Sequence, residues 1–583
     1  IIRYHGAKAF GDWRNRLTFL GDDEDGNQHF FDTEVVTAFI LSQKKEYNVN
    51  KIYLDAFEQI SFGSGQKYPE VNVTVNKAFD KGHLIFNYLG HGGGSGMAHE
   101  RVITREQILS WNNTDASPLV ITATCELSRF DDPAEESPGE LMLFDNDGGA
   151  IGLITTTRLV IIGNNSDLNE QIFDENIFFL HDGEKPTIGQ VYSRCKNKSA
   201  RNVNQRNFIL LGDPAMKVAY PEYKVVTTSI NDSLVGVNPL DTLKAFEKVK
   251  VTGAVMENGQ IVTDFNGFVY PTIFDKFAKY RTLANDPESY SSNYRMQSSV
   301  LYRGKVSVIN GEFSFQFIVP KDIAYEFGTG KISYYAENGV RDGHGFQDDF
   351  FIGGSGQKIT DDDKGPDIEL YLDNESFVFG GTTNTQPVLY AELFDENGVN
   401  TVGNGIGRDL LAIIDEGTDQ ERIIVLNDFY TAKLDSYQEG EIQYEMEPLS
   451  AGRHTLKIKV WDVYNNSSEA YTEFIVAKDD ELSISHVLNY PNPFTTNTSF
   501  HFDHNKVGQE LDITLKIFSV AGNIVKSFAA TEFAQSGHFQ DIAWDGRDEY
   551  GDRLARGVYL YKLNVKSEDG TESSVFQKLL LLK

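Results

Sequence analysis

The chain has 583 residues and a formal net charge of −32 at pH 7. This length predicts about four domains, and the acidic balance argues against nucleic acid as a partner, because phosphates attract Lys and Arg. With two cysteines no disulfide framework is expected, and no apolar run of about 18 residues predicts a membrane-spanning helix. The chain starts with Ile1 and shows no signal-peptide pattern, so we expect a mature or trimmed part of a longer protein.

Residues 1–220 alternate strand-like and helix-like segments, which is typical of a parallel α/β sheet. The first strand is predicted at Arg16–Asp23, the second at Lys51–Phe57 and the last at Asn207–Pro214. Helices are predicted at His29–Gln43, Pro69–Gly82, Asp167–Leu180 and Pro186–Lys196, the first with an apolar face of Phe31, Val35, Ala38 and Phe39. Capping boxes are predicted at Thr104–Gln107 and Ser137–Glu140.

Two apolar runs end in reactive residues. LIFNYLGHGGGSG (Leu84–Gly96) leads into His91, and SPLVITATCE (Ser117–Glu126) leads into Cys125. Continuous apolar runs of this length are typical of buried parallel strands. Because ligands of open α/β sheets bind at the carboxyl ends of the strands, we expect His91 and Cys125 to stand at the same crevice.

This pair of side chains suits nucleophilic catalysis. A thiol is only slightly ionised at neutral pH, and a neighbouring imidazole can take its proton and later protonate a leaving amine. The glycines after His91, from Gly92 on, let the backbone approach a bound carbonyl, and an N–H there together with that of Cys125 would stabilise an oxyanion. The structural alternative is a core cysteine and a turn histidine.

Other candidate residues surround this pair. Asp22 and Asp23 end the first strand, where a carboxylate would orient the ring of His91; the alternatives are a helix N-terminal carboxylate or a calcium ligand in DDEDGN (22–27). Arg158 lines the substrate pocket in one reading and forms a structural salt bridge in the other. Cys195 shares a helix face with Ile188, Val191 and Tyr192, which predicts a core position.

At these motifs the first 220 residues resemble the gingipain-like cysteine peptidases, relatives of caspases and legumains; FILLGDPAMKV (208–218) is a further element of that kind. The resemblance implies a caspase-like α/β domain with His91 as the catalytic histidine and Cys125 as the nucleophile. Glu126 follows the nucleophile where caspases differ, so it and Arg158 are kept as substrate-binding candidates and no substrate preference is inferred. No cofactor is expected, and a structural calcium ion is the only metal considered.

After residue 220, alternating runs and Asn-Gly turns predict β-sandwiches. One is expected at 221–355 with an insertion at Lys276–Ser299, followed by a linker at Gly353–Pro366 and a second, immunoglobulin-like sandwich at 367–478. We expect these two modules to act as spacers or docking modules, because neither holds a catalytic constellation.

Residues 480–583 are predicted to form a third immunoglobulin-like sandwich. Its YPNPF, WDGRDEYG and GVYLYKL segments resemble the C-terminal sorting domains of cargo of the Bacteroidota type IX secretion system. This resemblance implies export and residence at the cell surface, associated with the outer membrane.

Two functions of gingipain-like proteins fit this domain order. One is a surface sortase that cleaves the sorting domain from type IX secretion cargo through a Cys thioester and transfers the cargo to anionic lipopolysaccharide. GDWR (11–14) with LGDDEDG favours it, and the resemblance then implies the outer-membrane β-barrel PorV as a partner. The alternative is a secreted gingipain-like endopeptidase that hydrolyses proteins. A third class, a non-catalytic adhesin, is disfavoured by the presence of both His91 and Cys125.

Overall fold

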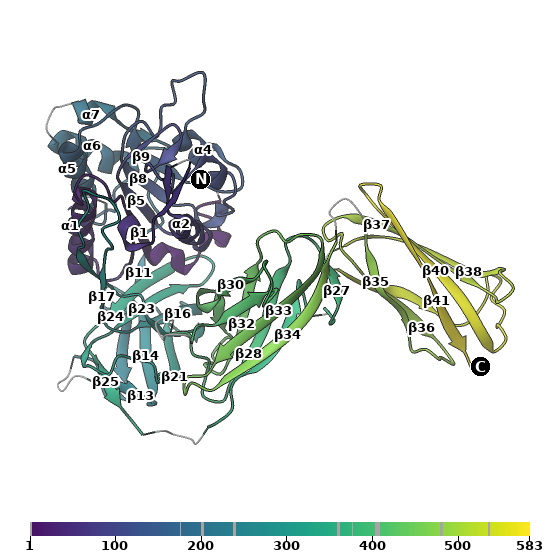
Figure 1. Ribbon diagram of the computed structural model, residues 1–583. Helices are drawn as coiled ribbons and strands as arrows, with labels where there is room; N and C mark the ends of the chain where they lie inside the picture. The colour runs from purple at the N-terminus through teal and green to yellow at the C-terminus, as the bar shows by residue number, and fades with distance from the viewer. Residues whose placement is uncertain are drawn as a thin grey trace. The chain divides into compact units, whose positions relative to one another are not determined.

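The computed structural model divides the chain into two compact units, residues 1–319 with 323–359 and residues 320–322 with 360–583, which are described separately (Figure 1). Among the residues described, no helix is long and apolar enough to cross a membrane. The structure describes residues 3–63, 65–174, 177–199, 203–236, 241–357, 362–375, 377–402, 408–477, 482–534 and 537–582.

A six-stranded sheet in the order β10-β9-β8-β5-β1-β2 forms the centre of the first domain. Five strands are parallel, as predicted, but β10 runs antiparallel to β9 at the edge. The bounds are β1 Arg16–Gly21, β2 Asn48–Tyr53, β5 Ile85–Leu89, β8 Leu119–Ala123, β9 Gly152–Thr156 and β10 Phe208–Leu211.

Helices cover both faces of this sheet (Figure 1). One buried core lies between the sheet and α1, α5 and α6, and a second lies between the sheet and α2, α3 and α4. Burial on both faces explains why β5 and β8 show mainly apolar runs rather than alternation. The bounds are α1 Gln28–Gln43, α2 Pro69–Lys81, α3 Arg105–Ile108, α4 Pro138–Phe144, α5 Ile162–Phe173, α6 Ile188–Lys198 and α7 Val203–Asn207.

Two helix predictions need correction. In α1, Phe31 and Val35 are exposed, and the buried face carries polar residues beside Val36 and Ile40. The reason is that polar members of this face have partners in the fold: Asp32 accepts from Ser166 of α5, and His29 lies 3.4 Å from Asp25 in the loop after β1. Helix α5 begins at Ile162 and ends at Phe173, earlier than predicted at both ends.

The predicted capping boxes are confirmed. Thr104 accepts from the backbone of Gln107 at the start of α3, and Ser137 and Glu140 form the second box at the start of α4. Between β5 and α3 the glycine-rich loop makes a small hairpin of β6 (Gly92–Gly93) and β7 (Gly96–Met97). This hairpin follows His91 directly.

A large β module completes the first unit. It holds a ten-stranded and a three-stranded sheet, and its Asn258–Gly259 turn has positive φ at both residues, as a tight hairpin requires. The bounds are β11 Tyr223–Ile230, β12 Ser233–Leu234, β13 Thr242–Ala245, β14 Lys248–Glu257, β15 Gln260–Ile261, β16 Gly267–Phe274, β19 Val300–Arg303, β20 Val306–Val308, β21 Glu312–Ile318, β22 Gly328–Thr329, β23 Lys331–Glu337, β24 Asp342–Gln347 and β25 Phe351–Ser355.

The insertion predicted in this module forms a hairpin of β17 (Ala278–Arg281) and β18 (Asn293–Met296). Tyr294 of β18 packs against Phe30 and Tyr53 of the first domain. Asn27 donates to the carbonyl of Tyr290 and accepts from its N–H. The insertion therefore holds the loop that follows β1.

The second unit contains two pairs of sheets. The predicted linker at Gly353–Pro366 is partly wrong, because β25 extends to Ser355; residues 358–361 lie outside the described part. The bounds are β26 Asp367–Leu372, β27 Gly381–Thr383, β28 Val388–Phe394, β29 Leu411–Ile414, β30 Arg422–Val425, β31 Tyr430–Ala432, β32 Glu439–Glu445, β33 Gly452–Trp461 and β34 Ser467–Val476, then β35 Ile484–Tyr490, β36 Thr498–His504, β37 Glu510–Phe518, β38 Ile524–Phe533, β39 His538–Trp544, β40 Gly557–Ser567 and β41 Glu572–Leu581.

Candidate active site

The register of two neighbouring strands places His91 and Cys125. Leu89 of β5 pairs with Ala123 of β8, and the N–H of Gly90 donates to the carbonyl of Ala123. Each reactive residue follows its strand end by the same two positions, so both stand at the carboxyl edge of the sheet, as predicted. Cys125 is partly accessible there.

Glycine lets the histidine loop come close to the cysteine strand. A Cβ on Gly92 would lie 2.5 Å from Thr124 Oγ1, which is closer than real atoms approach. After the nucleophile, Glu126 adopts a positive φ of 51°. This tight turn ends the β8 segment and leaves the thiol at a loop edge.

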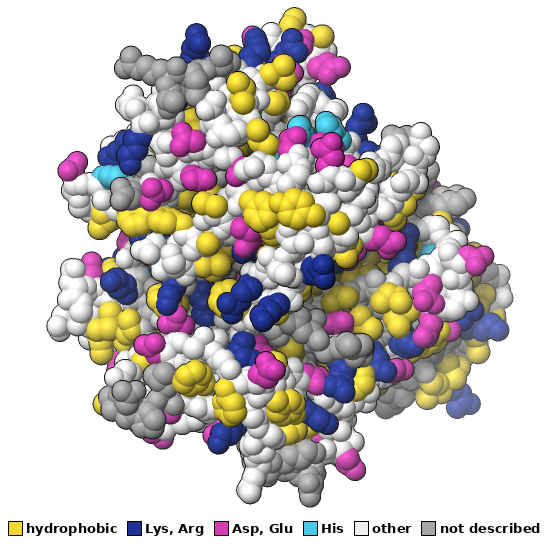
Figure 2. All heavy atoms as spheres, turned by 60° about the vertical axis from the view of Figure 1, so that its left-hand side comes forward, with side chains coloured by type: hydrophobic (Ala, Val, Ile, Leu, Met, Phe, Trp, Pro, Cys, Tyr) yellow, Lys and Arg dark blue, Asp and Glu magenta, His cyan; other side chains and the backbone are white. Residues whose placement is uncertain are grey.

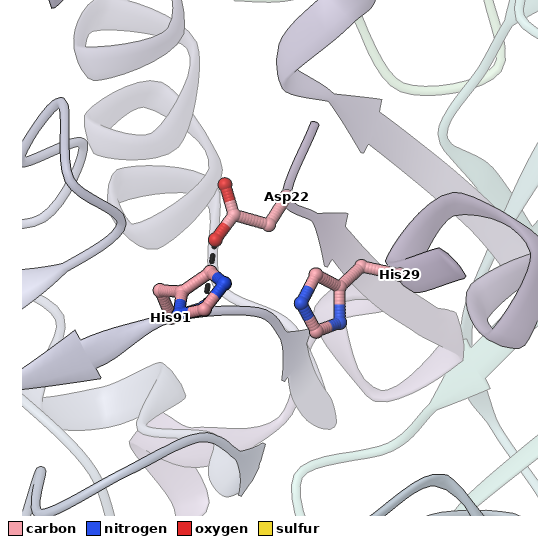
Figure 3. Close-up of side chains that lie close together, drawn as sticks. All are labelled: Asp22, His29 and His91. Carbon is pink, nitrogen blue, oxygen red and sulfur yellow. Dashed lines mark hydrogen bonds between the residues drawn. The ribbon is translucent and has the colours of Figure 1, made fainter. Parts of the chain in front are cut away.

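The main chain of His91 is held at both of its polar groups. Its N–H donates to Asp22 Oδ2 at 2.7 Å, and its carbonyl accepts from Tyr88 Oη at 2.6 Å and from the N–H of Ala98 at 2.8 Å. Asp22 is buried with 1% exposure, and Figure 3 shows it next to His91 and His29. The loop therefore has a fixed backbone under the ring.

The ring of His91 contacts other carboxylates than those predicted. Its Nε2 lies 2.9 Å from Asp25 Oδ2 and 3.3 Å from Glu24 Oε2. Asp22 is used by the His91 backbone, and Asp23 accepts from Tyr68 Oη at 2.5 Å. Asp25 thus takes the orienting place predicted for Asp22 or Asp23, since the loop turns through positive φ at Asp25 and brings its side chain to the ring.

Two further histidines lie around this ring. His99 stacks on His91 with ring centroids 4.8 Å apart and contacts Glu24 at 2.6 Å, a hydrogen bond that raises the pKa of His99. His29 lies edge-on with centroids 5.5 Å apart, and burial lowers its pKa. Neither histidine was predicted as a site residue. Their carboxylate neighbours Glu24 and Asp25 do belong to the DDEDGN run (22–27) considered in the sequence analysis. His29 and His99 have no local sequence signal.

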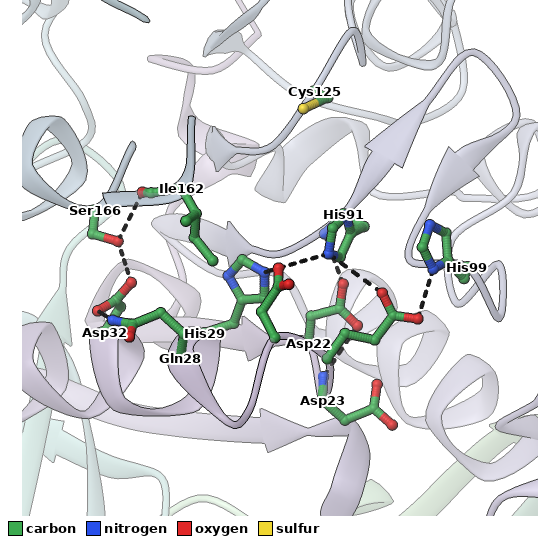
Figure 4. A network of polar contacts seen from close by, with 12 residues as sticks. Asp22, Asp23, Gln28, His29, Asp32, His91, His99, Cys125, Ile162 and Ser166 are labelled. Atoms are coloured by element: carbon green, nitrogen blue, oxygen red, sulfur yellow. Dashed lines mark hydrogen bonds and ion pairs between the residues drawn. The ribbon is translucent and has the colours of Figure 1, made fainter. Parts of the chain in front are cut away.

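Cys125 stands apart from this network (Figure 4). Its Sγ accepts from the N–H of Val160 at 3.4 Å and lies 3.7 Å from the Val160 carbonyl. Because Asp25 occupies Nε2, Nδ1 of His91 is the nitrogen left to accept the thiol proton. Catalytic hydrogen bonds commonly tighten only when a substrate is bound.

Residues 1–219 match the family model described as peptidase family C25. This domain is a cysteine peptidase of the gingipain family. No curated protein matches the sequence.

Two solved structures illustrate the likeness. The dimeric latent PorU of Porphyromonas gingivalis is 20% identical over 97% of this chain and 64% of its own, with a TM-score of 0.31. The Arg-specific cysteine proteinase gingipain R is 14% identical over 61% of this chain and 70% of its own, with a TM-score of 0.32. The chain therefore spans less than two thirds of the length of that PorU.

Next to the nucleophile, the C25 domain has an acidic cavity of about 290 Å³. Gly94 of the histidine loop and Glu126 line it, and Arg129 lies 3.6 Å from Asp132 across an exposed ion pair. The other lining residues are Ser95, Glu135, Glu136 and Ser137. Its carboxylates outnumber its one cation, so the cavity suits a positively charged group.

The two other candidates, Arg158 and Cys195, have structural positions. Arg158 is not among the residues lining that cavity; it donates to both carboxylate oxygens of Asp131 on the surface, at 3.0 and 2.5 Å, in agreement with the salt-bridge reading. Cys195 is buried with 1% exposure in the core beside Ile188 and Val191, as predicted, and burial raises the pKa of its thiol to about 12. Cys195 is therefore unsuited to act as a nucleophile.

Proposed function

We propose that the chain is a PorU-like sortase of the type IX secretion system, which cleaves the C-terminal sorting domain from cargo and transfers the cargo to anionic lipopolysaccharide. The observation that carries the catalytic part is the paired register that sets His91 and Cys125 at adjacent strand ends. The finer assignment is supported by the GDWR and LGDDEDG segments before the site and by the sorting-like segments after residue 480.

In the first step His91 takes the proton of the Cys125 thiol, and Sγ attacks the scissile carbonyl of the cargo. The C–N bond breaks, and the imidazolium returns the proton to the departing amine of the sorting domain. The product is a thioester between cargo and Cys125. In the second step an amine of the lipopolysaccharide attacks that carbonyl, the C–S bond breaks, and an amide forms as the thiol is restored.

The acidic cavity supports an amine over water as the second nucleophile. Glu126 follows Cys125 directly and lines the cavity together with Glu135 and Glu136. Carboxylates attract an ammonium group and can accept the proton that it must lose before it attacks. The attraction applies to an ammonium group and not to an uncharged water molecule.

We further propose that the protein acts at the cell surface in association with the outer membrane, with the β-barrel PorV as partner. The support is the sorting-like C-terminal module, which a sortase would keep for docking. In this module β41 is an edge strand, and Phe494 covers part of that edge by pairing with Leu580 and Leu582. A partner would meet the rest of the module.

The test is the mass of cargo carboxyl termini from cells with the natural protein and with Cys125→Ala. A lipopolysaccharide adduct that disappears in the variant supports the sortase. Cargo that ends in a free carboxylate, again only with intact Cys125, would identify a secreted gingipain-like endopeptidase instead. Normal processing in the variant would exclude the covalent mechanism.

A further inference from the structure

Three carboxylates are buried together beneath the histidine loop. Asp22 and Asp23 follow β1, and Glu100 follows β7; their exposed fractions are 1%, 3% and 2%. One oxygen of each lies within 4.8 Å of the others. They form a compact set, here called the buried carboxylate triad.

The triad is short of hydrogen-bond donors. Asp23 Oδ1 and Glu100 Oε2 are buried without a hydrogen-bond partner among the described residues. Within the same part of the chain, no ion pair joins the triad to Lys, Arg or His. Leaving buried carboxylate oxygens unpaired is strongly unfavourable, so such groups normally pair or coordinate a metal.

Mutual repulsion adds to this cost. Burial, with the neighbouring Asp286, Asp22 and Glu100, raises the pKa of Asp23 to about 10. Burial, with Asp22, Glu24 and Asp286, raises the pKa of Glu100 to about 7. In the absence of a cation, protonation relieves this repulsion; a cation bound among the three oxygens would replace the proton and let the carboxylates ionise.

We propose that the buried carboxylate triad binds a divalent cation that prefers oxygen ligands, Ca²⁺ in the first place. The triad has no imidazole or thiolate, which Zn²⁺ and the softer metals prefer. Ca²⁺ accepts flexible sets of carboxylates, carbonyls and water, whereas Mg²⁺ demands near-octahedral geometry and keeps its water. The unpartnered oxygens of Asp23 and Glu100 are the first ligands.

A cation here would join three segments at the active site. Asp22 also accepts the His91 N–H, so the ion sits next to the residue that fixes the catalytic loop. Asp286, close enough to raise the pKa of Asp23 and Glu100, comes from the insertion of the β module. The cation would therefore connect the loop after β1, the loop after β7 and the insertion. This structural role does not depend on whether water or an amine attacks the thioester.

Terbium luminescence tests the proposal, because Tb³⁺ occupies calcium sites and is excited through nearby tyrosines. Tyr68 donates to Asp23 and Tyr88 lies 3.2 Å from Asp22 Oδ2, so both are in place. We expect the full chain, freed of metal by a chelator, to give tyrosine-sensitised emission that Ca²⁺ displaces. Ca²⁺ should also raise Tm by at least about 3 °C over the chelated protein.

Variants locate the signal. Asp23→Asn and Glu100→Gln should each lower the affinity for Ca²⁺ at least tenfold, and Glu70→Gln, an exposed carboxylate on α2, should not. Loss of the signal in His99→Gln would place the ion at the neighbouring Glu24–His91–His99 cluster and overturn the proposal. Asp462 belongs to a further acidic cluster, with Asp362 and Asp395. Loss of the signal in Asp462→Asn would place the ion at that cluster and would also overturn the proposal.

One measurement stands apart from the variants. The natural chain is first loaded with excess Ca²⁺ and then dialysed, and its calcium content is measured by elemental analysis. We expect at least one calcium ion per chain to be retained. A calcium-free protein with an unchanged Tm would overturn the proposal even if no variant folds. Neither result depends on peptidase or sortase activity, so this inference can fail while the proposed function stands.

Discussion

At the scale of residues, different carboxylates contact the backbone and the ring of His91. Asp22 holds the main chain of His91, and Asp25 contacts Nε2. Substitution of Asp22 and substitution of Asp25 should therefore impair catalysis by different routes. Asp25 acts by positioning the ring and by stabilising the imidazolium that forms when the thiol loses its proton.

Asp25→Asn should lower kcat by about 10²-fold, because the amide keeps the size of the side chain but loses its charge. KM should change little, because Asp25 contacts the His91 ring and does not line the acidic cavity. Glu58→Gln, an exposed carboxylate of the same domain, is the matched control. A variant with unchanged kcat would show that the Asp25 contact has no part in catalysis.

His83 provides a test by pH. It is buried with 1% exposure, and burial lowers its pKa to about 3. Below about pH 6.5 the His83 imidazole is protonated in the unfolded chain but stays neutral in the folded chain. The free energy of unfolding therefore decreases as the pH falls from about 6.5 toward 3. His83→Phe, which packs between Phe79 and Phe86, removes this loss.

The free energy of unfolding of the natural chain should fall relative to His83→Phe by about 1.4 kcal/mol for each pH unit within that window. The buried His344, which also has a pKa lowered to about 3, is present in both proteins and cancels. Denaturant unfolding at pH 7, 6, 5 and 4 measures the difference. Parallel curves would mean that His83 is protonated in the fold.

At the scale of elements, sequence patterns predicted the parts of the site that rest on regular structure. Continuous apolar runs located β5 and β8, and their ends located His91 and Cys125. Asp25 was missed, because its approach to the ring depends on a loop with positive φ and on an insertion far along the chain. The buried face of α1 was missed because it packs polar groups.

The contact between the insertion and the first domain can be tested at Asp55. Its carboxylate accepts the N–H groups of Ala284 and Asn285 at 2.9 and 2.7 Å, and it is buried with 4% exposure. Asp55→Ala leaves these donors unpaired, which should destabilise the first unit by about 1–3 kcal/mol. Hydrogen exchange at Ala284 and Asn285 should accelerate.

Glu58→Ala is the control for this change, because Glu58 is exposed on the same segment. If Asp55→Ala exchanged at the same rate as the control, the insertion would be held by its aromatic contacts alone. Those contacts, Tyr294 with Phe30 and Tyr53, remain in both variants.

At the scale of the whole molecule, recurring turn signals and strand alternation predicted sheets after residue 220, and the structure has sheets there. The antiparallel edge strand β10 and the extension of β25 were not predicted, since pairing direction and strand ends depend on long-range contacts. We propose that function at this scale depends on docking through the C-terminal module.

Deleting residues 482–583 should release the protein from the membrane fraction while leaving the peptidase reactive toward a thiol-directed peptide inhibitor. The reason is that the catalytic pair lies in the first unit, and the deleted residues lie in the second. Fractionation of cells followed by inhibitor labelling makes the measurement. A truncated protein that still co-purified with PorV would assign anchoring to other parts of the chain.

The most direct test of the central claim is the site of covalent modification by a peptidyl thiol-directed inhibitor, read by mass spectrometry of the folded, full chain. We predict one adduct, on Cys125, that is absent in Cys125→Ala, formed much more slowly in His91→Ala, and unchanged in Cys195→Ser. An adduct on Cys195, or equal labelling rates with and without His91, would contradict a His91-activated Cys125 nucleophile.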